Sequence, residues 1–158
     1  MKPTIKTQIT RVILILCSFG FISSASGAEG KDTVRKEVIA VLDAFMVSFS
    51  ASDPKAHTAT YHFPHFRLAN GAMNSWQTRD DAIKAHEQIF PRLRESGWHR
   101  SVWIDRDIIG MSDTKVHVAT RFRRLRADGS EIITAESLYV LTYEQGRWGI
   151  KLRSSYLK

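Results

Sequence analysis

The stretch EIITAESLYVLTYEQGRWGIKLRSSY, residues 131–156, decides the fold of this chain. Apolar and polar residues alternate on both sides of Gln145-Gly146, a pattern typical of two antiparallel strands joined by a tight turn. Similar alternation covers residues 98–109 and 114–126, and turn-forming residues separate the runs. The second half of the chain therefore predicts four long strands that follow one another as an antiparallel meander.

The first half of the chain predicts helices. Apolar residues recur at helical spacing over residues 32–50, so an amphipathic helix is expected there. A short helix over residues 54–60 and a third helix over 78–97 are expected from their capping residues. Between them, Asn70-Gly71 separates two extended segments, which is a strong hairpin signal.

This order of elements predicts an α+β fold in which three N-terminal helices pack on a strongly curved, mainly antiparallel sheet. Together with the closing run Gly146-Arg-Trp-Gly-Ile150, it resembles the nuclear transport factor 2-like superfamily over residues 32–156. SnoaL-like proteins, ketosteroid isomerase and scytalone dehydratase are its best-known enzymes. The resemblance implies a cystatin-like cone with an apolar pocket at one end and a homodimer formed through the outer sheet face. It implies no single activity, since the fold hosts both enzymes and non-catalytic proteins.

Residues 1–28 have the composition of a secretory signal peptide. Basic residues precede an apolar run at 12–22, and small residues follow at 23–28. The apolar run is shorter than the roughly 20 residues that a membrane-spanning helix needs, and the bulky residue before Cys17 disfavours a lipid anchor. A retained signal anchor is the alternative, and cleavage is preferred. Residues 29–158 are therefore expected to form one periplasmic or secreted domain without membrane attachment.

The composition excludes some classes of function. Cleavage would remove three basic residues, so the formal net charge would fall from +7 to +4. It would also remove Cys17, the only cysteine, and with it disulfide and thiol chemistry. The run Arg121–Arg126 fits either an anionic partner or a solvated strand face, and the solvated face is preferred. The mild positive excess gives no reason to expect a nucleic-acid partner.

Motifs of established chemistry are missing from the sequence. There is no His-Glu-x-x-His zinc pattern, no Gly-x-Ser-x-Gly elbow, no phosphate-binding loop and no dinucleotide fingerprint. His62 and His65 have a spacing that suits metal sites on helices, but on a strand this spacing points them to opposite faces. No metal and no cofactor are therefore expected.

The first expected strand, residues 61–69, offers a candidate general base. Successive strand residues face opposite sides, so His62 and Phe66 share one face while His65 and Arg67 share the other. Because Phe66 suits the interior, the alternation predicts that His62 faces the pocket, where an imidazole can act as a base near neutral pH. The alternative is a packed histidine that is bonded to the backbone.

Other side chains complete the predicted site. Tyr139 could donate a hydrogen bond to a ligand carbonyl, which makes it the predicted catalytic partner of His62. Phe66, Trp76 and Trp103 are predicted, with these two residues, to contact a small apolar or partly polar ligand.

Alternation also predicts the faces of the closing strands. Val118 and Phe122 belong to the expected core face of their strand. In the last strand, Ile150 is expected on one face and Lys151 and Arg153 on the opposite face.

Two functions remain open, beside a third interpretation, a dimerisation module whose filled cone would leave no cavity. The favoured one is a binding domain with an apolar pocket, in which catalysis is unproven. The other is a SnoaL-like acid–base enzyme of the isomerase, dehydratase or hydrolase type, with His62 as its base. No Asp or Glu occurs from Tyr61 to Trp76, so a carboxylate base of the ketosteroid isomerase kind has no evident counterpart.

Overall fold

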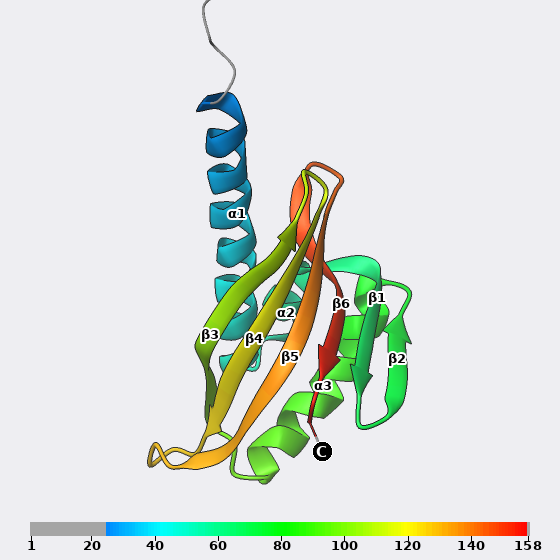
Figure 1. Cartoon of the computed structure of the whole chain (residues 1–158). Helices are drawn as coiled ribbons and strands as arrows, with labels where there is room; N and C mark the ends of the chain where they lie inside the picture. Colours follow the sequence, from blue (N-terminus) through cyan, green and yellow to red (C-terminus); the bar gives the residue numbers. More distant parts are fainter. Residues whose placement is uncertain (1–24, 158) are drawn as a thin grey trace, which may run out of the picture.

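The structure of the chain, a computed structural model, describes residues 25–157 (Figure 1). It contains three helices and six strands, in the α+β arrangement that the sequence predicts. The predicted signal, residues 1–28, lies mostly outside the described residues and stays a prediction. The elements are α1 (Ala25–Ser50), α2 (Pro54–Ala59), β1 (Tyr61–Ala69), β2 (Ala72–Trp76), α3 (Arg79–Glu95), β3 (Arg100–Met111), β4 (Lys115–Leu125), β5 (Glu131–Glu144) and β6 (Arg147–Ser155).

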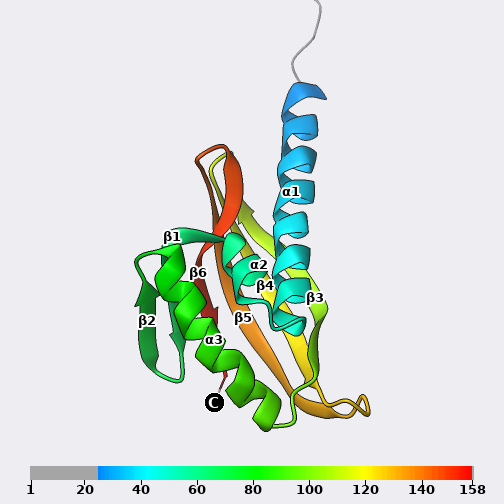
Figure 2. The same cartoon turned by 180° about the vertical axis from the view of Figure 1, so that it is seen from behind.

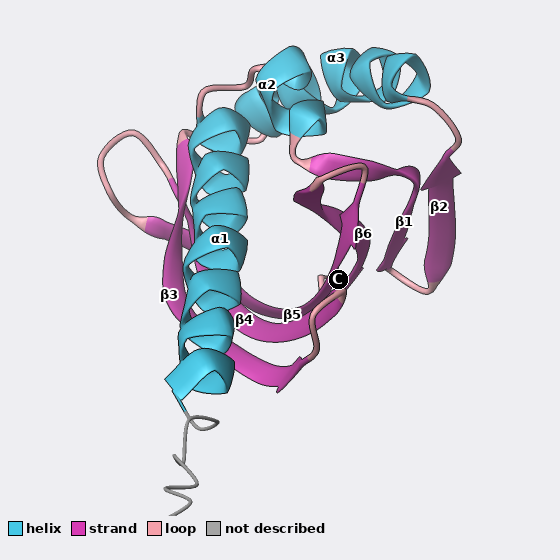
Figure 3. Cartoon of the chain, turned by 90° about the horizontal axis from the view of Figure 1, so that it is seen from above, coloured by secondary structure: helices cyan, strands magenta, loops and turns pink. Residues whose placement is uncertain are grey.

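The strands form one sheet in the order β2-β1-β6-β5-β4-β3. All neighbours are antiparallel except β1 and β6, which run parallel. The sheet curls strongly, and the helices lie along its open side (Figures 2 and 3). Helix α1 packs on β3 and β6, while α3 packs on α2 and β2. The predicted meander is confirmed, whereas the parallel pairing of β1 with β6 joins segments far apart in the sequence.

Local signals explain where the short elements begin. Asp53 caps α2, since its side chain accepts a hydrogen bond from the Ala56 amide at 3.0 Å. Thr78 and Asp81 form a capping box at the start of α3. The β1–β2 hairpin turns at Asn70 and Gly71, which have φ angles of 55° and 71°. Such left-handed backbone favours these two residue types.

One apolar core joins α1 to the sheet. From α1 it takes Val38, Leu42 and Phe45, and its partners on the strands include Tyr61, Val116, Val118, Tyr139, Leu141, Trp148 and Ile150. Burial of this apolar area supplies the main stabilisation of the fold. Within residues 25–157, no helix has the length and apolar character needed to span a membrane.

A bulge in β6 changes which side chains face the core. Leu141 of β5 pairs with Ile150, but Val140 pairs with Leu152, so Lys151 is an extra residue. Beyond the bulge, Arg153 pairs with the buried Tyr139. The prediction that Arg153 faces away from Ile150 is therefore wrong, because strict alternation does not continue through a bulge.

Gly149→Ala is expected to destabilise the fold. A Cβ atom at this position would lie 2.8 Å from the His62 ring and 2.9 Å from Nη1 of Arg147. Overpacking of this kind usually lowers the free energy of unfolding by about 1–3 kcal/mol. Urea denaturation should show the loss, and Gly110→Ala is the control, since nothing lies within 4 Å of a Cβ there. Equal midpoints for the two variants would contradict the close packing of His62.

Candidate functional site

A cavity of about 370 Å³ lies between α3 and the sheet. Most of its wall is apolar, including two aromatic rings, and an imidazole, an amide and three guanidinium groups interrupt it. The lining residues are Phe49, Arg67, Asn70, Trp76, His86, Ile89, Leu93, Arg124, Ile132, Ile133, Arg153 and Leu157. A narrow cleft that shares Arg124 and Arg153 with the cavity is lined by Phe45 and Tyr139.

The three arginines of the cavity have no acidic partner among residues 25–157. The Nε atoms of Arg67, Arg124 and Arg153 are buried and have no hydrogen-bond partner among the described residues. None of the ion pairs formed within residues 25–157 includes any of the three. The guanidinium of Arg153 instead lies 5.3 Å from the ring centroid of Phe45 and 5.9 Å from that of Tyr139. Such cation–π contacts offset only part of the loss of hydration.

These arginines raise the positive potential of the cavity. Burial, with a further contribution from the charge of Arg153, lowers the pKa of Arg67 to about 10. Burial and Arg153 also lower the pKa of Arg124. Both groups still carry their charge at neutral pH. The cavity wall therefore holds three positive charges without an acidic partner in the described chain, and guanidinium groups are well suited to bind carboxylate, sulfonate or phosphate.

Buried side chains form a connected chain behind this wall. Nε2 of His57 lies 2.8 Å from the Tyr61 hydroxyl, which lies 3.3 Å from Nε2 of His86. Nδ1 of His86 donates to the Ala82 carbonyl at 2.8 Å. The ring of His65 stacks on Tyr61 with a centroid distance of 3.8 Å. The cavity thus shares His86 with a hydrogen-bonded chain that reaches α2.

All three of these histidines are neutral at physiological pH. Burial lowers the pKa of His86 to about 4 and the pKa of His65 to about 3, and the charge of Arg153 acts in the same direction on both. Burial also holds the pKa of His57 well below its usual value of 6.5, and His86 adds to this effect. A charged imidazole in this region would lose its hydration and face the arginines.

The inner face of β1 is the opposite of the predicted one. Tyr61 and His65 are buried, and Arg67 lines the cavity. Phe66 is half-buried and lines neither the cavity nor the adjoining cleft. The prediction that His62 and Phe66 face the pocket is therefore wrong. Apolar character is a poor guide here because the inner face of this strand places the polar side chains of His65 and Arg67 beside the core and the cavity.

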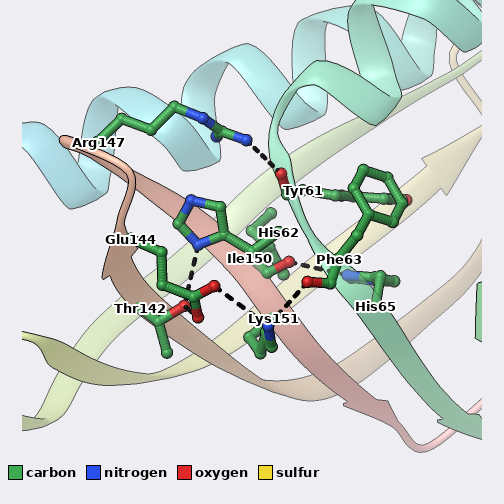
Figure 4. Close-up of polar contacts among 9 residues, drawn as sticks. All are labelled: Tyr61, His62, Phe63, His65, Thr142, Glu144, Arg147, Ile150 and Lys151. Carbon is green, nitrogen blue, oxygen red and sulfur yellow. Dashed lines mark hydrogen bonds and ion pairs between the residues drawn. The ribbon is translucent and has the colours of Figure 1, made fainter. Parts of the chain in front are cut away.

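His62 lies in a separate polar cluster (Figure 4). Its Nδ1 atom lies 2.9 Å from the hydroxyl of Thr142, which donates to Glu144 at 2.7 Å. Because the threonine hydrogen goes to the carboxylate, Nδ1 of His62 is the donor in the other contact. Lys151 closes the cluster with contacts to Glu144 at 3.2 Å and to the Phe63 carbonyl at 3.0 Å.

The Nε2 atom of His62, which a general base would use, is buried and has no partner in the described chain. The predicted alternative of a packed histidine matches this environment, except that the bond goes to a side chain.

Of the other residues predicted to contact the ligand, two line the cavity or the adjoining cleft and one lies in the core. Trp76 lines the cavity, and Tyr139 lines the adjoining cleft. Trp103 packs against Tyr139, with ring centroids 5.7 Å apart, and its Nε1 donates to the Leu42 carbonyl. Trp103 therefore belongs to the core. Among the described residues, no group of three His, Cys, Asp or Glu side chains could hold a metal ion.

Sequence reasoning did not select Arg67, Arg124, Arg153 or His86. A signal existed for Arg124, because it continues the alternation of Val118 and Phe122 on the core face of β4. Its place in a run of charges suggested a solvated face instead. No comparable signal existed for Arg153, which the bulge turns inward.

Acid is expected to weaken the fold through these histidines. As the pH falls through 6.5, the usual pKa, the unfolded chain takes up protons that folded His57, His65 and His86 do not. The free energy of unfolding therefore falls as the pH falls below 6.5. The contribution of His86 levels off at about pH 4 and that of His65 at about pH 3, where each group also becomes protonated in the folded state. Each such group contributes up to about 1.4 kcal/mol per pH unit.

Urea denaturation at several pH values between 5 and 7.5 measures this dependence. His86→Gln should reduce it, and His99→Gln, at an exposed position, should not. Equal stability across the range would contradict the neutral state of the buried histidines.

Comparisons with known proteins agree with this architecture. A structure from Shewanella oneidensis, described as an NTF2-like protein of unknown function, has a TM-score of 0.64 and 16% identity over 78% of this chain and 98% of its own. An NTF2-like protein with a cystatin-like fold from Novosphingobium aromaticivorans has a TM-score of 0.70 and 12% identity over 87% and 92% of the two chains.

A Catenulispora acidiphila structure, solved in complex with S-DNPA, has a TM-score of 0.62 and 15% identity over 79% and 93%. At these identities, the likeness shows the fold alone. Comparison with curated proteins gives no match. A family model described as NTF2-like protein (DUF6841) matches residues 36–153, so the chain belongs to this NTF2-like family.

Proposed function

We propose that this domain binds a small organic anion in the cavity between α3 and the sheet. Arg67, Arg124 and Arg153 hold the charged group, and the apolar walls contact the rest of the molecule. The observation that carries this proposal is that all three guanidinium groups have a buried, unpartnered Nε atom on the wall of one cavity. Buried polar groups without partners are uncommon, and they lower stability unless a ligand satisfies them.

The shape and polarity of the cavity define the class of ligand. Its volume of about 370 Å³ lies in the usual range for small-molecule sites. Ile89, Leu93 and Ile133 offer aliphatic contacts, and Trp76 offers an aromatic face. A molecule with one carboxylate, sulfonate or phosphate group on a compact apolar body fits this combination. The Catenulispora acidiphila complex supports small-molecule binding by this fold.

Binding accounts for the geometry better than catalysis by His62. The base in the enzyme alternative would be Nε2 of His62, which is sealed within a cluster outside the cavity wall. Tyr139, its predicted partner, lies beside the arginines instead. The proposal also includes that the domain is exported and works as a homodimer, as the sequence analysis predicts.

Benzenesulfonate and benzoate are expected to raise the melting temperature of the protein, because a ligand that binds only the folded state stabilises it by mass action. Benzyl alcohol, which has the same ring without the charge, should give a smaller shift. Arg153→Met should abolish the shift caused by the two anions. The melting temperature of the free protein should stay the same or rise in this variant, because a buried charge without a partner is removed.

Arg123→Met is the matched control for that variant. It removes a guanidinium group from the same sheet at an exposed position next to Arg124. Thermal melting with and without each ligand should give the wild-type shift in this control. If Arg123→Met and Arg153→Met lose the shift equally, general charge attraction explains the binding and the cavity site is rejected. If benzyl alcohol and the anions stabilise equally, the arginines do not select the ligand.

A further inference from the structure

The inner histidines of the chain His57–Tyr61–His86 have fixed tautomers when they are neutral. Nδ1 of His57 lies 3.3 Å from the Phe45 carbonyl oxygen, and Nδ1 of His86 lies 2.8 Å from the Ala82 carbonyl oxygen. A carbonyl oxygen can only accept, so each Nδ1 carries a hydrogen. The Ser48 hydroxyl, which also lies near Nδ1 of His57, donates its own hydrogen to the Ala44 carbonyl. Toward His57 it can therefore only accept. Each Nε2 atom therefore carries a lone pair and no hydrogen.

The hydroxyl of Tyr61 cannot satisfy both lone pairs. It lies 2.8 Å from Nε2 of His57 and 3.3 Å from Nε2 of His86, and it has one hydrogen to donate. Whichever nitrogen receives that hydrogen, the other faces an oxygen lone pair. One added proton removes the conflict, because His86 could then donate to Tyr61 while Tyr61 donates to His57. The chain of three side chains thus has room for one more proton.

The surroundings of His86 decide whether that proton is present. The groups that face it are His57 from α2, Tyr61, His65 and Arg67 from β1, and Arg153 from β6. Burial is the main cause that lowers its pKa to about 4, and Arg153 and Arg67 lower it further, against the raising effect of the Ala82 hydrogen bond. The same two arginines line the cavity. An anion bound to them would oppose their effect on the imidazole.

We infer that the cavity binds its anion together with one proton, which the chain His57–Tyr61–His86 takes up from solvent at the Nε2 atom of His86. This inference rests on the proposed anion site and adds its dependence on pH. In the empty cavity, His86 is neutral at physiological pH. Once an anion occupies the arginines, the imidazolium is stabilised and every contact in the chain has its hydrogen. Binding therefore becomes tighter as the pH falls toward the pKa of the free histidine.

Calorimetric titration of the protein with benzenesulfonate tests the inference. The sulfonate stays ionised throughout, so any proton uptake belongs to the protein. Titrations in Bis-Tris and imidazole, two cationic buffers with different heats of ionisation, give the number of protons bound per ligand. We expect uptake approaching one proton below pH 7, and an affinity that rises by up to about tenfold per pH unit between pH 7.5 and 5.5.

The variant His86→Gln distinguishes proton uptake from anion binding. The glutamine amide can donate to Tyr61 without a charge, so benzenesulfonate should still bind while proton uptake falls to near zero. His65→Gln is the matched control, because His65 stacks on the same tyrosine but, among the described residues, its hydrogen bond goes to the Ile150 carbonyl and not to the Nε2 atoms of the chain. It should keep the wild-type proton uptake. If either variant fails to fold, the ¹⁵N shift of His86 Nε2 in the wild type, with and without benzenesulfonate at pH 6, reports the same protonation directly.

The outcomes separate the two proposals. Binding without proton exchange, or an unchanged nitrogen shift on binding, would overturn the proton site and leave the anion site standing. Proton uptake that survives His86→Gln and disappears in His65→Gln would also overturn it. No binding of benzenesulfonate by the wild-type protein at any pH would reject the anion site, and the coupled proton with it.

Discussion

The burial of three guanidinium groups without an acidic partner in residues 25–157 is the constraint on which the rest of this structure depends. A buried charge without a partner lowers stability, so other parts of the fold must offset it. The core between α1 and the sheet does so with apolar area, and the rings of Phe45 and Tyr139 lie within cation–π distance of Arg153. Burial, with a smaller contribution from the positive charges, keeps the neighbouring histidines neutral.

The arginines reach the cavity through irregularities in the sheet. The extra residue in β6 turns Arg153 toward Tyr139, and the parallel pairing of β1 with β6 brings Arg67 to the same region. Arg124 arrives by simple alternation along β4. A regular sheet with the same sequence would leave Arg153 on the outer face and the cavity with less charge. Strand register therefore decides the chemistry of the site as much as residue type does.

Local sequence signals predicted most of the fold and little of the site. Thr78 with Asp81, and Asn70-Gly71, act over a few residues, so their meaning can be read directly from the chain. Which face of β1 borders the cavity, and so whether His62 points toward it, depends on the tertiary structure and not on local sequence. The inward turn of Arg153 depended on a bulge that the sequence of β6 does not mark. The arginines of the run Arg121–Arg126 are exposed except for the half-buried Arg124, and composition alone could not tell them apart.

The apolar wall of the cavity is partly separate from the residues that hold the protein together. Ile89 and Ile133 line the cavity, yet neither belongs to the buried clusters of the described chain. Their size can change without opening the core, while the arginines stay fixed on paired strands. Such an arrangement lets sequence divergence alter the shape of the cavity and keep its charge. A few substitutions in one helix and one strand are therefore enough to reshape the cavity while the three guanidinium groups keep their places.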